Sequence, residues 1–152
     1  MKTRLLIASG ISIAALAIPL HQSTQAQNFP APPQSCVFLK EVTTSQTAIR
    51  KVIRGDNSNA NTDFVVPTGK RFVKYEGQFI PENNAGYTVE VNLKYPNNTS
   101  SQVINRKIDN ARRFYLYRQG FRAPTTNQPY QVNARITGAR NNAYRIAILA
   151  CS

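Results

Sequence analysis

The chain has 152 residues, of which 41% are hydrophobic and 17% charged, and its formal net charge at pH 7 is +12. This length fits one globular domain with a sizeable core and leaves no room for a second. The chain has one histidine and two cysteines, too few for the usual tetrahedral zinc sites.

The first segment in chain order predicts export. It begins with a basic start, residues 1–4, continues with an apolar run over residues 5–20 and ends in a polar stretch at Ala26. We predict a signal peptide over residues 1–26, cleaved after Ala26, and a secreted or periplasmic protein. An uncleaved anchor is the alternative, but the apolar run is shorter than the ~20 residues that a spanning helix needs.

Residues 27–35 contain three prolines, Pro30, Pro32 and Pro33, which cannot join a strand ladder. We expect a proline-rich extended leader here, followed by a single domain over residues 36–152. The domain starts with a short apolar run, residues 36–39, which predicts a central strand beside the C-terminal one.

The middle of the chain alternates apolar and polar residues, the period of two that is typical of half-buried strands. Turn residues separate these stretches, and the longest polar loop is expected over residues 55–63. The expected strands cover residues 47–54 (a weak edge strand), 71–80, 87–95 (the cleanest alternation), 102–108 and 113–117.

Residues 130–151 carry the clearest strand pattern in the chain. Residues 130–137 alternate, with Tyr130, Val132, Ala134 and Ile136 on one face, and residues 143–151 are apolar on both faces. We predict that these two strands pair as a hairpin through residues 138–142. The second strand would then lie inside a packed sheet.

Seven to nine short strands and no amphipathic helix predict an all-β fold, an antiparallel β-sandwich of the jelly-roll or Ig-like kind. Two cysteines in an exported chain predict one disulfide, between Cys36 and Cys151. It would close a loop of more than 110 residues. In the chain-entropy model such a bridge contributes ~4–5 kcal/mol.

The charge is distributed unevenly. After removal of residues 1–26, the chain keeps 17 basic and 7 acidic residues, a net charge of +10. Residues 27–90 have a net charge of +1, whereas residues 91–152 have +9. A positive surface of this kind attracts polyanions. The alternative interpretation is that the excess charge serves only solubility.

One stretch combines arginines with aromatic rings. Six positive charges and four aromatics fall within residues 106–122. Guanidinium groups suit sulfate, phosphate and carboxylate, and aromatic rings offer stacking faces. The alternative is that Phe114 and Leu116 belong to the core and the arginines form a solvated face. The candidate binding residues are Arg106, Lys107, Arg112, Arg113, Tyr115, Tyr117, Arg118 and Arg122.

The chain contains few residues of the kinds that enzymes use for catalysis. His21, the only histidine, lies in the predicted signal peptide, which excludes catalysis by serine–histidine or cysteine–histidine pairs. The asparagine-rich stretch 56–63 lacks the glycine and the bidentate glutamate of a calcium loop. We therefore expect no cofactor and no metal site.

The leading hypothesis is an exported, non-enzymatic module of the cell envelope or extracellular space that binds polyanions, with anionic glycans favoured. The first alternative is a structural or protein-interaction module, whose charge serves an acidic protein partner or solubility. The second is a glycan hydrolase that uses a pair of carboxylates, which would need two acids facing each other across a cleft.

Overall fold

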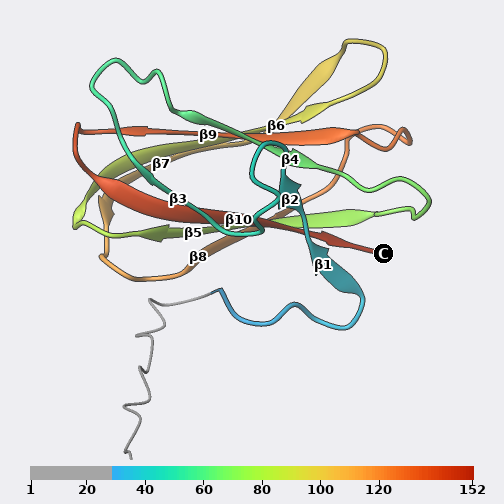
Figure 1. Cartoon of the computed structure of the whole chain (residues 1–152), viewed down its shortest axis with the longest axis horizontal. Helices are drawn as coiled ribbons and strands as arrows, with labels where there is room; N and C mark the ends of the chain where they lie inside the picture. Colours follow the sequence, from blue (N-terminus) through green and yellow to red (C-terminus); the bar gives the residue numbers. More distant parts are fainter. Residues whose placement is uncertain (1–28) are drawn as a thin grey trace, which may run out of the picture.

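The computed structural model describes residues 29–152, so the signal peptide predicted over residues 1–26 lies outside the described residues. Ten strands form two five-stranded antiparallel sheets that pack against each other as a sandwich (Figure 1). The predicted all-β fold, an antiparallel β-sandwich, is confirmed. Over residues 29–152 we find no helix with the length and apolar character to cross a membrane.

Each sheet takes strands from both ends of the chain, so the fold is built from long-range pairings. Sheet A contains β1 (Cys36–Phe38), β10 (Ala143–Cys151), β5 (Lys74–Pro81) and β8 (Tyr117–Phe121) in that order, with β3 (Ile49–Val52) also paired to β10. Sheet B has the order β2 (Lys40–Glu41), β4 (Asn61–Val65), β9 (Gln131–Gly138), β6 (Ala85–Lys94) and β7 (Ser100–Ala111).

The predicted hairpin over residues 130–151 is wrong. Strand β9 pairs with β4 and β6 in sheet B, whereas β10 pairs with β1, β3 and β5 in sheet A. Residues 139–142 therefore carry the chain from one sheet to the other (Figure 1). Both strands turn apolar side chains into the shared core, and their alternation looks the same whether they pair or face each other.

The predicted strand over residues 113–117 is also wrong. Strand β7 ends at Ala111 and β8 begins at Tyr117, and the connection between them contains Phe114 with a φ of 59°. A left-handed backbone at this residue breaks the extended conformation that a strand requires. In addition, the polar loop expected over residues 55–63 is shorter, because residues 61–63 already belong to β4.

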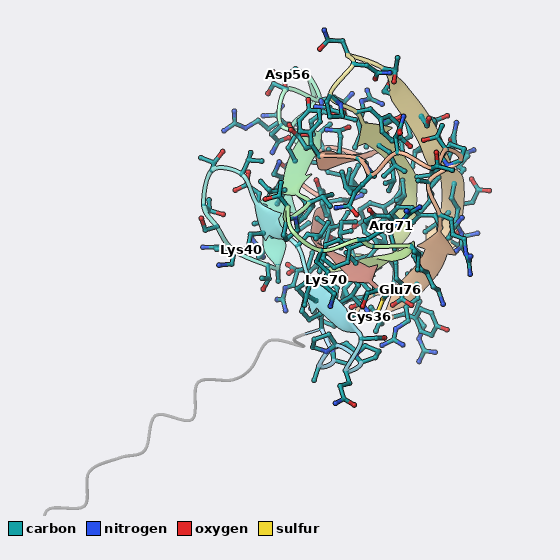
Figure 2. All side chains as sticks on the ribbon, turned by 90° about the vertical axis from the view of Figure 1, so that its right-hand side faces the viewer. Cys36, Lys40, Asp56, Lys70, Arg71 and Glu76 are labelled. Atoms are coloured by element: carbon teal, nitrogen blue, oxygen red, sulfur yellow. A yellow bond between two sulfur atoms is a disulfide. The ribbon has the colours of Figure 1, made fainter. Side chains whose placement is uncertain are left out.

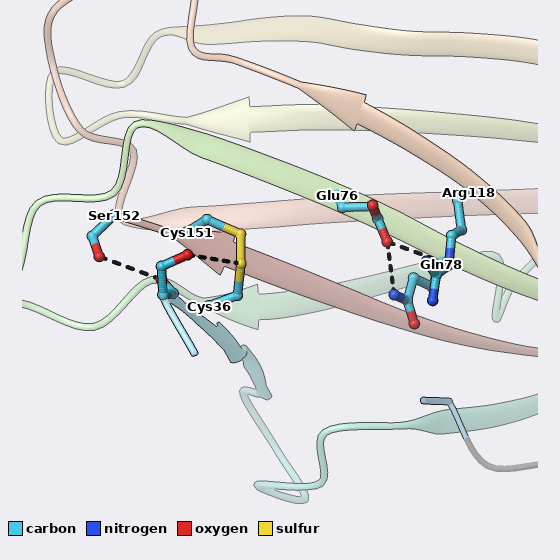
Figure 3. The surroundings of a disulfide bond; sticks show 7 residues. Cys36, Glu76, Gln78, Arg118, Cys151 and Ser152 are labelled. Atoms are coloured by element: carbon cyan, nitrogen blue, oxygen red, sulfur yellow. Dashed lines mark hydrogen bonds and ion pairs between the residues drawn. A yellow bond between two sulfur atoms is a disulfide. The ribbon is translucent and has the colours of Figure 1, made fainter. Parts of the chain in front are cut away.

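The predicted disulfide between Cys36 and Cys151 is confirmed. The two residues lie opposite each other in the β1–β10 pairing, with 4.0 Å between their Cα atoms and a separation of 115 positions in sequence (Figure 3). The backbone N–H of Ser152 also donates to the carbonyl of Ser35. The bridge thus holds the first strand of the sandwich against the last.

Aromatic rings fill the space between the sheets. The ring of Phe79 in β5 lies 5.2 Å from that of Tyr87 in β6 and 5.8 Å from that of Tyr144 in β10, measured between centroids. The Tyr87 hydroxyl donates a hydrogen bond to the carbonyl of Ala143. These contacts join both sheets and fix how their edges lie relative to each other.

Replacing both cysteines (Cys36→Ser with Cys151→Ser) should lower the free energy of unfolding by about 4–5 kcal/mol, because the unfolded chain regains the freedom of a very long loop. Urea unfolding of the two proteins measures this difference. Adding reductant should destabilise the wild type and leave the double variant unchanged. Equal stability of the two proteins without reductant would contradict a stabilising role for the bridge.

Candidate functional site

The eight predicted binding residues do not form one patch. Five of them gather where β7, the edge of sheet B, runs near β8, the edge of sheet A. We call these five the tyrosine–arginine edge: Arg106, Arg112, Arg113, Tyr115 and Tyr117. Of the other three, Arg118 follows Tyr117 and lines the same slot between the sheets, but its side chain contacts Glu76, whereas Lys107 and Arg122 lie elsewhere on the sandwich.

The side chain of Arg106 reaches from β7 in sheet B toward β8 in sheet A. In the β6–β7 pairing it lies opposite Val89, and along β7 it follows Ile104, whose side chain is buried between the sheets. Alternation along the strand therefore directs Arg106 toward the same side. Its guanidinium carbon lies 5.8 Å from the ring centroid of Tyr117 in the other sheet, a cation–π contact.

Tyr117 is held in place from three sides. Besides Arg106, it contacts the ring of Tyr115 edge-on, with 4.8 Å between centroids, and its hydroxyl accepts a hydrogen bond of 2.9 Å from the backbone N–H of Arg112. The side chain of Tyr115 is 51% exposed. The edge thus pairs one fixed ring with one ring that is open to solvent.

The turn between β5 and β6 holds the loop that carries the arginines. The backbone N–H of Arg113 donates to Oδ1 of Asn84 at 2.7 Å, and that of Phe114 donates to the carbonyl of Pro81 at 2.7 Å. The guanidinium of Arg113 lies 4.4 Å from the ring centroid of Phe114. These bonds replace the sheet pairing that was expected for residues 113–117.

The edge strands β7 and β8 belong to different sheets, and the opening between them is called the mouth. A narrow apolar slot lies beneath this mouth. Residues from both sheets line it, including Phe79, Val89 and Ile104, and Arg106, Tyr117 and Arg118 are also among its lining residues. Its volume of about 30 Å³ is enough for about one water molecule. A ligand at this site would therefore lie across the edge and not enter the core.

Two of the remaining predicted residues have acidic partners. Lys107 points away from the mouth and forms an ion pair of 2.9 Å with Asp109. Arg118 lies 3.7 Å from Glu76, which also accepts a hydrogen bond from Gln78 (Figure 3). Local carboxylates compensate both charges. Arg122 is exposed beyond the other end of β8, away from residues 112–116.

By contrast, the three arginines of the tyrosine–arginine edge have no acidic partner within 4.0 Å among residues 29–152. Elsewhere in the basic half, Lys94, Arg135 and Arg145 each form an ion pair with a carboxylate. Much of the charge excess counted from the sequence is thus neutralised locally. The edge keeps exposed guanidinium groups beside aromatic rings.

Glu82 is a carboxylate with two arginine partners. Burial raises the pKa of Glu82, but hydrogen bonds and charges from Arg50 and Arg145 outweigh it and hold the pKa below its usual value. A carboxyl that acts as a general acid needs the opposite shift. In the part of the chain that the structure describes, no group of three or more His, Cys, Asp or Glu side chains could hold a metal ion.

Comparison with known proteins gave structural likeness only. No family model matches the chain, and no curated protein matches its sequence. The chain is similar to a mutant of a family 29 carbohydrate-binding module, with a TM-score of 0.48 and 10% identity, covering 78% of this chain and 76% of that one. It is also similar to the N-terminal cellulose-binding domain of β-1,4-glucanase C from Cellulomonas fimi, with a TM-score of 0.40 and 11% identity, covering 79% and 88%. We draw no conclusion about a ligand from likeness at this level.

The sequence gives no indication of the residues that hold the tyrosine–arginine edge in place. Asn84 and Pro81 lie about 30 residues before the loop that they hold. Their contacts with residues 113 and 114 depend on the sheet order, which carries no local sequence signal. The aromatic residues of 114–117 are recognisable in the sequence, but their alternation predicts a strand where the structure has a loop up to Tyr117.

Replacing Tyr117 by phenylalanine should keep the ring and remove the hydroxyl that accepts the Arg112 N–H. We expect a loss of unfolding free energy of up to about 1 kcal/mol, the usual range for one hydrogen bond. The Arg112 amide should also exchange faster with solvent, which NMR-detected hydrogen exchange measures. The matched control is Tyr130→Phe at another exposed tyrosine. Unchanged exchange at Arg112 would contradict the bond.

Glu82 should make the fold sensitive to acid. Its folded pKa is lowered, so its ion pairs stabilise the fold above the unfolded pKa, which lies near 4.5. This contribution is lost as the pH falls through the folded pKa. Glu82→Gln should therefore be less stable than the wild type at pH 7, with the difference shrinking below about pH 4 in urea titrations at several pH values. A difference independent of pH would contradict this prediction.

Proposed function

We propose that this protein is an exported, non-enzymatic module that binds acidic glycans along the tyrosine–arginine edge. The observation that carries the proposal is the arrangement of Tyr115, Tyr117, Arg106 and Arg112. An exposed ring lies edge-on to a fixed ring, and the guanidinium of Arg106, which has no acidic partner among residues 29–152, lies 5.8 Å from the centroid of the fixed ring. The backbone N–H of Arg112 donates to the hydroxyl of the same ring.

Tyrosine rings and arginine guanidinium groups together favour an acidic sugar over a neutral one. The C–H groups on the face of a sugar ring suit the negative face of an aromatic ring such as Tyr115. Sulfate and carboxylate groups accept hydrogen bonds from guanidinium groups, with a planar geometry that lysine cannot offer. A ligand that carries both features would satisfy the ring and the arginines together.

The shape of the site also supports a glycan as the ligand. Because the slot beneath the mouth holds only about one water molecule, small apolar ligands have no cavity to enter. The rings and arginines lie along an open strand edge, which suits an extended chain molecule. Export, as proposed from the N-terminal sequence, would separate the protein from its own nucleic acid and favour glycans over DNA or RNA.

Replacing Tyr115 by alanine should weaken binding of a sulfated or uronate-containing oligosaccharide about tenfold, because one stacking contact contributes roughly 1–3 kcal/mol for bases on aromatic rings. Isothermal titration calorimetry measures this change. Val42→Ala, at an exposed apolar side chain outside both loops of β8, is the control. The acidic-glycan proposal would be overturned by unchanged affinity of the Tyr115 variant, or by a neutral oligosaccharide that binds as tightly.

The salt dependence of binding tests the proposed role of Arg106 and Arg112. Arg106→Gln combined with Arg112→Gln should weaken binding and lower the slope of log affinity against log salt concentration by about one for each guanidinium group that no longer binds an anion. A double variant at Lys40 and Arg140 removes the same charge elsewhere and should leave the slope nearly unchanged. If both double variants change the slope equally, the charge acts only as a diffuse field, and the proposed role of Arg106 and Arg112 is wrong.

A further inference from the structure

A second cationic groove lies at the opposite end of β8 from residues 112–116. It opens between two loops, residues 66–73 after β4 and residues 122–130 after β8, and has a volume of about 200 Å³. Figure 2 looks onto this end of the sandwich, where Lys70 and Arg71 are labelled close to Cys36. We call it the arginine groove, after its lining residues Arg71, Arg122, Thr125, Thr126 and Asn127.

One side chain joins the two loops of the arginine groove. Oε1 of Gln128 accepts a hydrogen bond of 2.8 Å from the backbone N–H of Phe72, and its Nε2 donates to the carbonyl of Lys70 at 3.0 Å. The residue between these two anchored positions is Arg71. The backbone that carries Arg71 is therefore held against the loop that begins with Arg122, before any ligand arrives.

The lining of the arginine groove favours an anion. Its lining residues include two arginines, two threonines, an asparagine and a glutamine beside three apolar residues, and no acidic residue. Among residues 29–152, neither Arg71 nor Arg122 has a carboxylate within 4.0 Å, unlike Arg118 at the middle of β8, which contacts Glu76. Two uncompensated guanidinium groups beside hydroxyl donors suit the oxygens of a sulfate or carboxylate group.

Two further cations strengthen the positive potential around the arginine groove. Lys70 directly precedes Arg71 in the chain, and its ammonium nitrogen lies 5.7 Å from the ring centroid of Phe72, a lining residue of the groove. Lys74, at the start of β5, packs its side chain near Gly120 on the neighbouring strand β8. Like charges gathered at one end of the sandwich repel one another, and a bound anion relieves that repulsion.

We propose that the arginine groove is a second subsite, which binds a sulfate or carboxylate group of the same acidic glycan chain. This inference rests on the proposed function, because it takes the ligand class from the tyrosine–arginine edge. Strand β8 links the two sites, with residues 112–117 at its start and Arg122 at its end. Occupying both sites with one chain converts the second contact into an intramolecular one, so longer chains bind more tightly.

NMR titration separates the two sites. In the wild type, a sulfated disaccharide and a uronate disaccharide are added in separate experiments, which distinguishes sulfate from carboxylate recognition. We expect saturable shifts of the backbone amides of residues 122–128 with at least one of them. Arg71→Gln combined with Arg122→Gln should abolish these shifts and keep those of residues 112–117. A double variant at Lys40 and Arg54 removes the same charge elsewhere and should keep both sets.

Chain length gives a second readout. A hexasaccharide of the better ligand should bind the wild type at least about tenfold more tightly than the disaccharide, and this gain should vanish in the Arg71 and Arg122 double variant. Shifts at residues 112–117 without shifts at residues 122–128 would overturn the second subsite and leave the proposed function intact. Shifts at residues 122–128 alone would instead overturn the tyrosine–arginine edge. Tighter binding of a single-stranded oligonucleotide in the groove than of either sugar would overturn the glycan assignment.

Discussion

The structure depends on the burial of β10. Its residues from Ile146 to Ala150 are at most 3% exposed, so both faces of the strand are covered and both of its edges are paired. A strand this apolar gains the most from a central position, because every side chain leaves water. Strands β1 and β3 then share one side of β10, and β5 takes the other. The disulfide ties Cys151, the last residue of this strand, to β1.

The position of β10 also decides where the two proposed binding sites lie. With β10 in the middle of sheet A, β8 becomes one outer edge of that sheet, while β7 becomes an outer edge of sheet B. These two edges meet on one side of the sandwich, where Arg106 reaches Tyr117 across the gap. The cross-sheet contact that organises the tyrosine–arginine edge is therefore a consequence of the strand order. The arginine groove arises at the other end of β8 for the same reason.

The charged residues are distributed differently in the fold than along the sequence. Counted along the chain, the second half carries a large excess of positive charge. In the fold, antiparallel pairing places several of these cations beside acids from other strands, such as Arg135 beside Glu90 and Lys94 beside Asp63. The cations without acidic partners in residues 29–152 lie mostly in loops and at edges. The two sites proposed above draw on these cations.

The sequence by itself determined the β-sandwich class, the partners in the disulfide and the inward faces of strands such as β6, because alternation and cysteine count are local properties. It also indicated Arg106, Arg112, Tyr115 and Tyr117 as candidate binding residues, and their role stays a prediction. It could not distinguish a hairpin from two strands that face each other across the core, as β9 and β10 do. Nor could it show that Asn84 and Pro81 hold residues 113 and 114 in a loop. Those contacts join residues far apart in the chain, and only the tertiary structure decided them.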